Sequence, residues 1–143
     1  MPRAFEDFQV GDVFELGSQK ITHEEIVRFA RMYDPQPRHL DHEDLIASGW
    51  HVTAMFMRLY AEGVLLHAEA EVSPGVEELR WLRPVRPGDV LTGRATVVGL
   101  AASLSRPDCG ILQQRGEFLD AQDRPVMRIT FYGLMRRRQA AGP

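Results

Sequence analysis

The sequence predicts an α+β fold, in which one buried helix is followed by a run of antiparallel strands. Over residues 50–62 most positions are apolar and few are charged, as is typical of a helix in the centre of a fold. Beyond residue 76, apolar and polar residues mix or alternate between turn sequences, as they do in strands of an antiparallel sheet. A helix segregated from an antiparallel sheet defines the α+β class.

An amphipathic helix is expected before the buried one, over residues 23–33. Thr22 is followed three residues later by Glu25, the spacing of the capping box that starts many helices. Behind this pair, apolar residues recur at helical spacing and define one face: Ile26, Phe29, Ala30 and Tyr33. Pro35 cannot continue a helix, so the helix is expected to end before it.

Most of the remaining chain is expected to form strands. A turn at Gly11-Asp12 and a short strand over residues 13–16 precede the helices. The later strands are rich in β-branched residues or alternate in polarity, and are expected at residues 76–85, 90–100, 111–119 and 126–134. From Arg136 onward we expect a frayed tail.

Size and composition favour an ordinary globular protein. The 143 residues suit one domain, residues 1–143, and a net charge of -3 gives no case for nucleic acid as a partner. No apolar run approaches the roughly 20 residues that a membrane span needs. The first six residues lack the apolar core of a signal peptide, so a cytoplasmic protein is expected. The single Cys109 excludes an internal disulfide and is expected to be a small buried residue.

The most informative segment is residues 34–41, with the sequence Asp-Pro-Gln-Pro-Arg-His-Leu-Asp. Proline fixes its own φ and restricts the residue before it, which predicts a stiff, extended loop. This loop holds Asp34 and His39 five residues apart. A carboxylate and an imidazole held close together can perform general acid–base catalysis. A purely structural pair, in which Asp34 ends the helix and His39 donates to a carbonyl, is the alternative.

These residues resemble the MaoC-like dehydratases, which include the (R)-specific enoyl-CoA hydratases. The motif of that family is Asp-x-Asn-Pro-x-His-x-Asp followed by a helix start that contains Gly, and residues 34–41 and 46–51 are similar to it. Residues 79–89 also look like the strand–turn–strand signature of the family. The resemblance covers nearly the whole chain. It implies a hot-dog fold, a helix wrapped by a curved sheet, and a homodimer with its sites near the subunit interface.

The resemblance also implies the chemistry. Asp34 and His39 correspond to the pair that activates water for addition to a trans-2-enoyl thioester, or for the reverse dehydration. The backbone N–H of Gly49 corresponds to the donor that polarises the thioester carbonyl, a role suited to a helix N-terminus. Substrate contacts are further expected from the neighbours of Gly49: Ser48, Trp50 and His51. The substrate is an acyl thioester of CoA or of a carrier protein, and no metal or redox cofactor is needed.

This sequence departs from the family pattern at three places. Gln36 stands where Asn is usual, Ala54 stands where relatives often have Ser, and residues 41–45 form a shorter stretch than in relatives. Two other functions therefore remain open. A hot-dog thioesterase usually has a catalytic acid on the central helix, where this chain offers only Glu62 at the far end. A non-catalytic acyl-binding or partner subunit is the other alternative.

Other polar residues carry weaker expectations. A metal site built from residues 39–43 is not expected, because neighbouring residues of an extended segment point to opposite faces. The Ser48 hydroxyl is expected to cap the buried helix. Trp50 is expected in the core or at an interface. Arginines suit phosphate and could bind CoA, but arginines more often form solvated faces: Arg83, Arg86, Arg136, Arg137 and Arg138.

Overall fold

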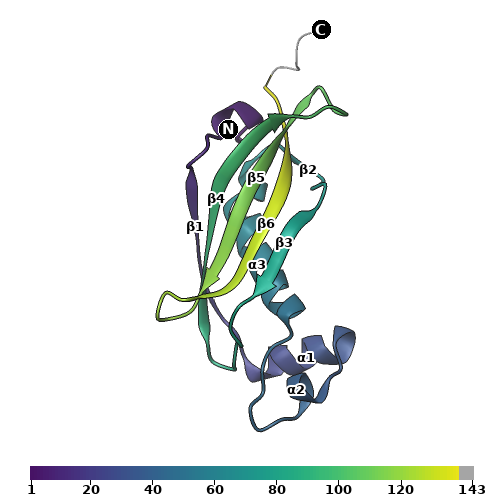
Figure 1. The fold of residues 1–143 in the computed structure, drawn as a ribbon, viewed down its shortest axis with the longest axis vertical. Coiled ribbons are helices and arrows are strands. Elements are labelled where there is room, and N and C mark those ends of the chain that lie inside the picture. Colours follow the sequence, from purple (N-terminus) through teal and green to yellow (C-terminus); the bar gives the residue numbers. More distant parts are fainter. Residues whose placement is uncertain (139–143) are drawn as a thin grey trace.

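Six strands form one antiparallel sheet in the computed structural model, which describes residues 1–138. The strands are β1 (Val13–Lys20), β2 (Ala70–Glu71), β3 (Val76–Trp81), β4 (Val90–Ala102), β5 (Cys109–Leu119) and β6 (Pro125–Arg136). The order across the sheet is β1-β4-β5-β6, and both β2 and β3 pair with the remaining edge of β6. The sheet curls around one long helix, α3 (Gly49–Gly63), as Figure 1 shows. The α+β prediction is confirmed.

Helix α3 buries one face against the sheet. Phe56 is 3% exposed, and its ring packs edge-on against Phe118 and Phe131. Gly116 in β5 makes this approach possible, because a Cβ there would lie 2.4 Å from the Phe56 ring. The opposite face of α3 is not buried, since Trp50 is 59% exposed. The expectation of a helix buried nearly all round is therefore wrong for one face.

Helix α1 (His23–Tyr33) has the predicted bounds, because its start is set by local chemistry. The Thr22 side chain accepts a hydrogen bond from the Glu25 backbone, and the Glu25 carboxylate accepts one from the Thr22 backbone. Ile26 is buried as predicted, but Tyr33 is 68% exposed, so the apolar face is shorter than its spacing suggested.

The predicted extended loop over residues 34–41 is wrong in its second half. Residues Pro37–Leu40 form a short helix, α2. Proline is compatible with the first position of a helix, where its missing N–H has no acceptor in any case. Helices α1 and α2 lie together beyond one end of the sheet, near the start of α3 (Figure 1).

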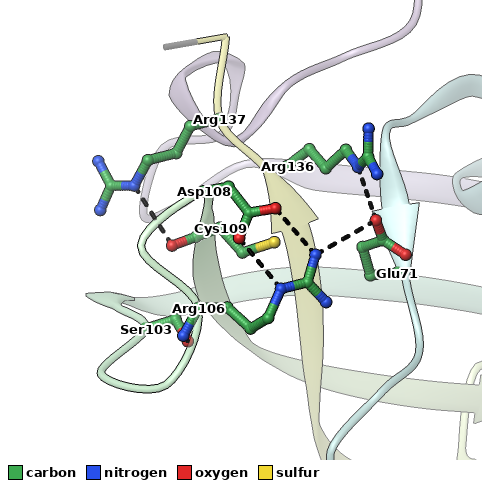
Figure 2. A network of polar contacts seen from close by, with 7 residues as sticks. All are labelled: Glu71, Ser103, Arg106, Asp108, Cys109, Arg136 and Arg137. Atoms are coloured by element: carbon green, nitrogen blue, oxygen red, sulfur yellow. Dashed lines mark hydrogen bonds and ion pairs between the residues drawn. The ribbon is translucent and has the colours of Figure 1, made fainter. Parts of the chain in front are cut away.

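The short segments at the other end of the sheet were not predicted. They are two 3₁₀ turns, η1 (Phe5–Asp7) and η2 (Leu65–His67), and the two-residue strand β2. A network of side chains holds this end together, as Figure 2 shows. Glu71 lies 2.6 Å from Arg136 and 3.6 Å from Arg106, and Arg106 also donates two hydrogen bonds to Asp108. The Arg106 guanidinium lowers the pKa of Asp108 to about 2.

The predicted frayed tail is wrong for residues 136–138. Arg136 belongs to β6, and the backbone N–H of Arg138 donates to a carboxylate oxygen of Glu6 at 2.9 Å. Residues 139–143 of the predicted tail lie outside the described residues. Over the described part of the chain, no helix is both long and apolar enough to cross a membrane.

Candidate active site

Asp34 and His39 come together because the chain reverses between them. Asp34 ends α1, where its backbone N–H donates to Ala30 at 2.9 Å. Helix α2 then turns His39 back, so that Nε2 lies 3.3 Å from Oδ2 of Asp34. The His39 side chain is 7% exposed and that of Asp34 is 20% exposed. The structure thus places the two predicted catalytic residues in contact.

His39 is held at its second ring nitrogen. Nδ1 lies 2.7 Å from the carbonyl oxygen of Ile46. A carbonyl oxygen only accepts, so the hydrogen-bond pattern assigns a proton to Nδ1. In the neutral ring Nε2 then carries the lone pair, and it is the nitrogen that faces Asp34. Nε2 is therefore the nitrogen that can take a proton from a bound molecule, and the imidazolium so formed would donate to Asp34.

Asp34 is kept ionised by hydrogen bonds. The side-chain amide of Gln36 donates to Oδ1 at 2.6 Å, and this bond is the main reason that the pKa of Asp34 lies below its usual value. The Ser48 hydroxyl is the second cause. Ser48 is buried, and its hydroxyl forms no hydrogen bond of good geometry within the described residues. The prediction that this hydroxyl caps α3 is therefore wrong. Gln36, the departure from Asn, therefore supports the charge of Asp34 directly.

A cavity of about 320 Å³ lies beside this pair. Its lining includes His39, Gly49, Trp81 and Val85, which come from α2, α3, β3 and the segment after β3. Asp34 is not part of the lining, although it contacts His39, which is. His39 and the start of α3 therefore line one surface cavity.

Gly49 is the first residue of α3, so its backbone N–H has no acceptor within the helix. The indole ring of Trp81 lies against it. A Cβ on Gly49 would stand 2.4 Å from two atoms of that ring, which no side chain tolerates. Trp81 is fixed there because its Nε1–H donates to Thr53 at 3.1 Å, and Thr53 donates to the Gly49 carbonyl at 2.9 Å. Sequence reasoning did not assign Trp81 to the site.

The three other predicted substrate contacts, Ser48, Trp50 and His51, are not part of the lining of this cavity. Trp50 packs edge-on against Trp81, with ring centroids 4.9 Å apart, and lines a different groove. His51 is buried and stacks on Phe29 of α1 at 4.9 Å, and its Nδ1 has no partner within the described residues. Burial lowers the pKa of His51. Contact of Ser48, Trp50 or His51 with substrate stays a prediction.

The remaining departures from the family pattern also have clear places. Ala54 lines an apolar groove of about 570 Å³ on the exposed face of α3, outside the cavity that contains His39. The short stretch at residues 41–45 is anchored to the turn after β3, because Arg86 donates to both carboxylate oxygens of Asp44 at 2.6 and 3.0 Å. Within residues 1–138, no three His, Cys, Asp or Glu side chains are grouped to hold a metal.

Residues 7–112 match the model of the MaoC-like domain family. The chain belongs to this family. A MaoC-like dehydratase from Rhodospirillum rubrum is 37% identical, with a TM-score of 0.88 over 95% of this chain and 98% of that one. A Mycobacterium tuberculosis protein with a double hot-dog fold has a TM-score of 0.71 at 19% identity, over 99% of this chain and 46% of that one. The MaoC-like protein therefore has the predicted hot-dog fold.

A shorter similarity links this MaoC-like protein to an enzyme of known reaction. Mesaconyl-CoA hydratase from Cereibacter sphaeroides is 36% identical over 69 residues, which is 48% of this chain and 20% of that protein. The chain thus spans about a fifth of the length of that relative. The hydratase activity of that relative therefore describes a much longer protein, of which this chain matches only a part.

Proposed function

We propose that this MaoC-like protein adds water to a trans-2-enoyl thioester, or removes water in the reverse direction. One observation carries the proposal. His39 contacts Asp34 through Nε2 while it lines the same cavity as Gly49, the first residue of α3. A proton-transfer pair and a backbone donor beside one cavity are what hydration of an α,β-unsaturated thioester requires. Family membership and the similarity to a CoA-thioester hydratase support the same class of reaction.

Asp34 and His39 have different roles in the activation of water: Asp34 binds the water, and His39 accepts a proton from it. Its hydrogen bonds keep Asp34 ionised, so it holds the water and balances the charge of an imidazolium. Nε2 of His39 takes one proton as the water oxygen bonds C3 of the enoyl group. The π electrons of C2=C3 move toward the thioester carbonyl and give an enolate. The same proton then passes from Nε2 to C2, so that water has been added and the protein is unchanged.

Gly49 acts at the developing negative charge. Its N–H points from the start of α3, where the helix dipole favours an anion. An oxygen that gains charge in the transition state binds such a donor more strongly than the ground-state carbonyl does. The scheme needs no metal or redox group, because the thioester itself makes the α-carbon acidic.

Thioester hydrolysis has less support from this site. The only carboxylate on α3 is Glu62, which is exposed and pairs with Arg58 one helical turn earlier. It lies at the opposite end of α3 from Gly49. An acid on the central helix, as a hot-dog thioesterase would use, is therefore not near the cavity that contains His39.

The assay that tests the proposal follows two signals separately. Purified protein is incubated with crotonyl-CoA and longer trans-2-enoyl-CoAs, and loss of enoyl absorbance and release of free thiol are recorded. Absorbance loss without thiol, absent in His39→Ala, is the expected result. Thiol release would assign a thioesterase instead. Silence in both signals across the chain-length series would favour an acyl-binding or partner subunit.

We also propose that the protein is a homodimer. Strand β3 pairs with β6 on one side, and its other edge has no strand beside it within the described residues. Apolar side chains are exposed around that edge and on the neighbouring face of α3: Val72, Val76, Trp81, Trp50 and Met57. An open strand edge flanked by apolar surface favours association with a second copy.

A further inference from the structure

Two arginines line the candidate active-site cavity, and the charge of one of them, Arg38, also contributes to lowering the pKa of Asp34. Arg38 precedes His39 in α2, and Arg83 follows β3; both line the cavity that contains His39 and Gly49. Within the described residues, neither guanidinium forms an ion pair. The chain as a whole is acidic, with a net charge of -3.

Two other arginines near the cavity are neutralised by ion pairs with carboxylates, unlike Arg83. Arg86 binds both oxygens of Asp44, and Arg124 binds Asp120 at 2.9 Å. Arg83 instead donates one Nη1–H bond to the Pro125 carbonyl at 2.8 Å, a contact that fixes the side chain without neutralising it. A guanidinium has five N–H donors, so most of those on Arg83 remain for another partner.

We propose that Arg38 and Arg83 bind an anionic group of the substrate and so determine specificity. This inference rests on the proposed hydratase function. A planar guanidinium matches carboxylate and phosphate groups, to which it donates two parallel hydrogen bonds. The substrate could supply either group: a carboxylate on the acyl chain, or a phosphate on the carrier arm. Because Arg38 and His39 line the same cavity, a carboxylate on the acyl chain would bind close to the reacting atoms, whereas a carrier-arm phosphate would bind a pantetheine length away from them.

A second cavity extends the site past Arg83. It has a volume of about 550 Å³ and lies between the turn after β3 and the β5–β6 hairpin. Arg83, Pro84 and Val126 line both cavities, so the two adjoin. An elongated substrate that occupied both cavities would therefore pass Arg83, which lies where they adjoin.

Three substrates separate the two sources of the anion. Crotonyl-CoA carries phosphates but no acyl carboxylate, fumaryl-pantetheine carries a carboxylate but no phosphate, and crotonyl-pantetheine carries neither. The variants are Arg38→Gln and Arg83→Gln, with Arg38→Lys and Arg83→Lys to retain charge. Arg115→Gln is the matched control, because it removes the same charge from a β5 residue that lies outside both cavities and that also forms no ion pair within the described residues.

We expect the Gln variants to lose about tenfold or more in kcat/KM for one anionic substrate, the loss expected for a charge-assisted hydrogen bond. The neutral crotonyl-pantetheine should change by less than about twofold, and the Lys variants should recover part of the loss. A loss confined to crotonyl-CoA identifies phosphate, and one confined to fumaryl-pantetheine identifies carboxylate. Equal losses on all three substrates, or none, would overturn the inference.

Calorimetry keeps this inference separate from the proposed reaction. Free CoA, pantetheine and fumarate are titrated into the wild type and into each variant. If no thioester is turned over, the hydratase proposal fails, yet binding of CoA or fumarate that is lost in Arg38→Gln and Arg83→Gln still supports the anion site. Binding that is absent in the wild type, or unchanged in both variants, contradicts it.

Discussion

Nε2 of His39 lies 3.3 Å from Oδ2 of Asp34, although the two residues belong to different helical segments. The same ring is fixed at Nδ1 by the Ile46 carbonyl, 2.7 Å away. With both nitrogens constrained, the imidazole cannot rotate without losing a contact. The site is therefore organised for one proton-transfer geometry before substrate arrives.

Replacement of either residue should remove most of the turnover. Asp34→Asn removes the charge that balances the imidazolium, and His39→Asn removes the proton acceptor. General acid–base groups contribute roughly 10²–10⁴-fold to rate. We expect a loss in kcat of that order in each variant, measured with the enoyl absorbance assay.

His39→Asn is chosen because its side-chain amide offers a donor to Ile46 near the position of Nδ1. His39→Ala lacks this donor and leaves the carbonyl without a protein partner. Both variants should lose activity, but His39→Asn should keep a thermal midpoint closer to that of the wild type. Near-normal turnover in either folded His39 variant would remove the residue from the mechanism.

Gln36 should influence the pH below which activity is lost. Its amide donates to Asp34 at 2.6 Å and is the largest cause of the lowered pKa of that carboxyl. Gln36→Leu removes the donor, so the pKa of Asp34 should rise and the acidic limb of the pH–rate profile should move to higher pH. An acidic limb at unchanged pH would show that Asp34 does not control it.

The hydrogen bond from Gln36 to Asp34 also predicts how the free energy of unfolding depends on pH. A carboxyl whose pKa is lower in the folded state stabilises the fold above its unfolded pKa of about 3.9. That contribution is lost as pH falls through the lower, folded pKa of Asp34. Urea unfolding of Gln36→Leu should differ from the wild type most at neutral pH, and the difference should shrink below about pH 4.

Gly49→Ala should destabilise the protein through Trp81. The new methyl group would stand 2.4 Å from the indole ring, so the ring must move and its bond to Thr53 is strained or lost. Overpacking of this kind costs about 1–3 kcal/mol. The measurement is a double-mutant cycle by urea unfolding. Gly49→Ala should cost clearly less in a Trp81→Ala background, and equal costs would contradict the packing argument.

Local chemistry explains which elements were predictable. Thr22 and Glu25 lie three residues apart, and the side chain of each accepts a hydrogen bond from the backbone N–H of the other. The start of α1 therefore follows from four residues of sequence. The motif likewise predicted that Asp34 and His39 act as a pair, but the contact depends on helix α2, because the extended loop expected there would have held the two side chains apart.

Contacts between distant segments explain what was missed. Trp81 meets Gly49 only because β3 pairs with β6 and brings the end of β3 to the start of α3. Arg138 is ordered by Glu6 from the other end of the chain. Sequence periodicity carries no information about such pairs, since neither partner has a signal in its own neighbourhood.

His51 should make stability depend on pH. Burial lowers its pKa, so the folded state binds fewer protons than the unfolded state below the ordinary His pKa of about 6.5. The unfolding free energy should therefore be undiminished above that pH and fall as pH decreases toward the folded pKa. In His51→Phe, which can keep the stack on Phe29, this part of the decline should disappear.

The control for this prediction is His42→Gln, because His42 is exposed in the segment after α2. Urea midpoints are compared at pH 7.5 and 5.5 for the wild type and both variants. His42→Gln should retain the wild-type difference between the two pH values. A full wild-type difference in His51→Phe would assign the pH dependence to another group.

The open edge of β3 gives the last prediction, which concerns assembly. Val76 lies in β3 and is 56% exposed, whereas Val13 lies in β1 at the opposite edge of the sheet and is 52% exposed. If two copies associate through β3, the charge of Val76→Lys is placed in the interface, where an unpaired charge is costly. Sedimentation should give twice the chain mass of 16.2 kDa for the wild type and Val13→Lys, and the single-chain mass for Val76→Lys. A wild type that sediments as a single chain, or a Val76→Lys dimer as stable as the wild type, would show that β3 is not the subunit contact.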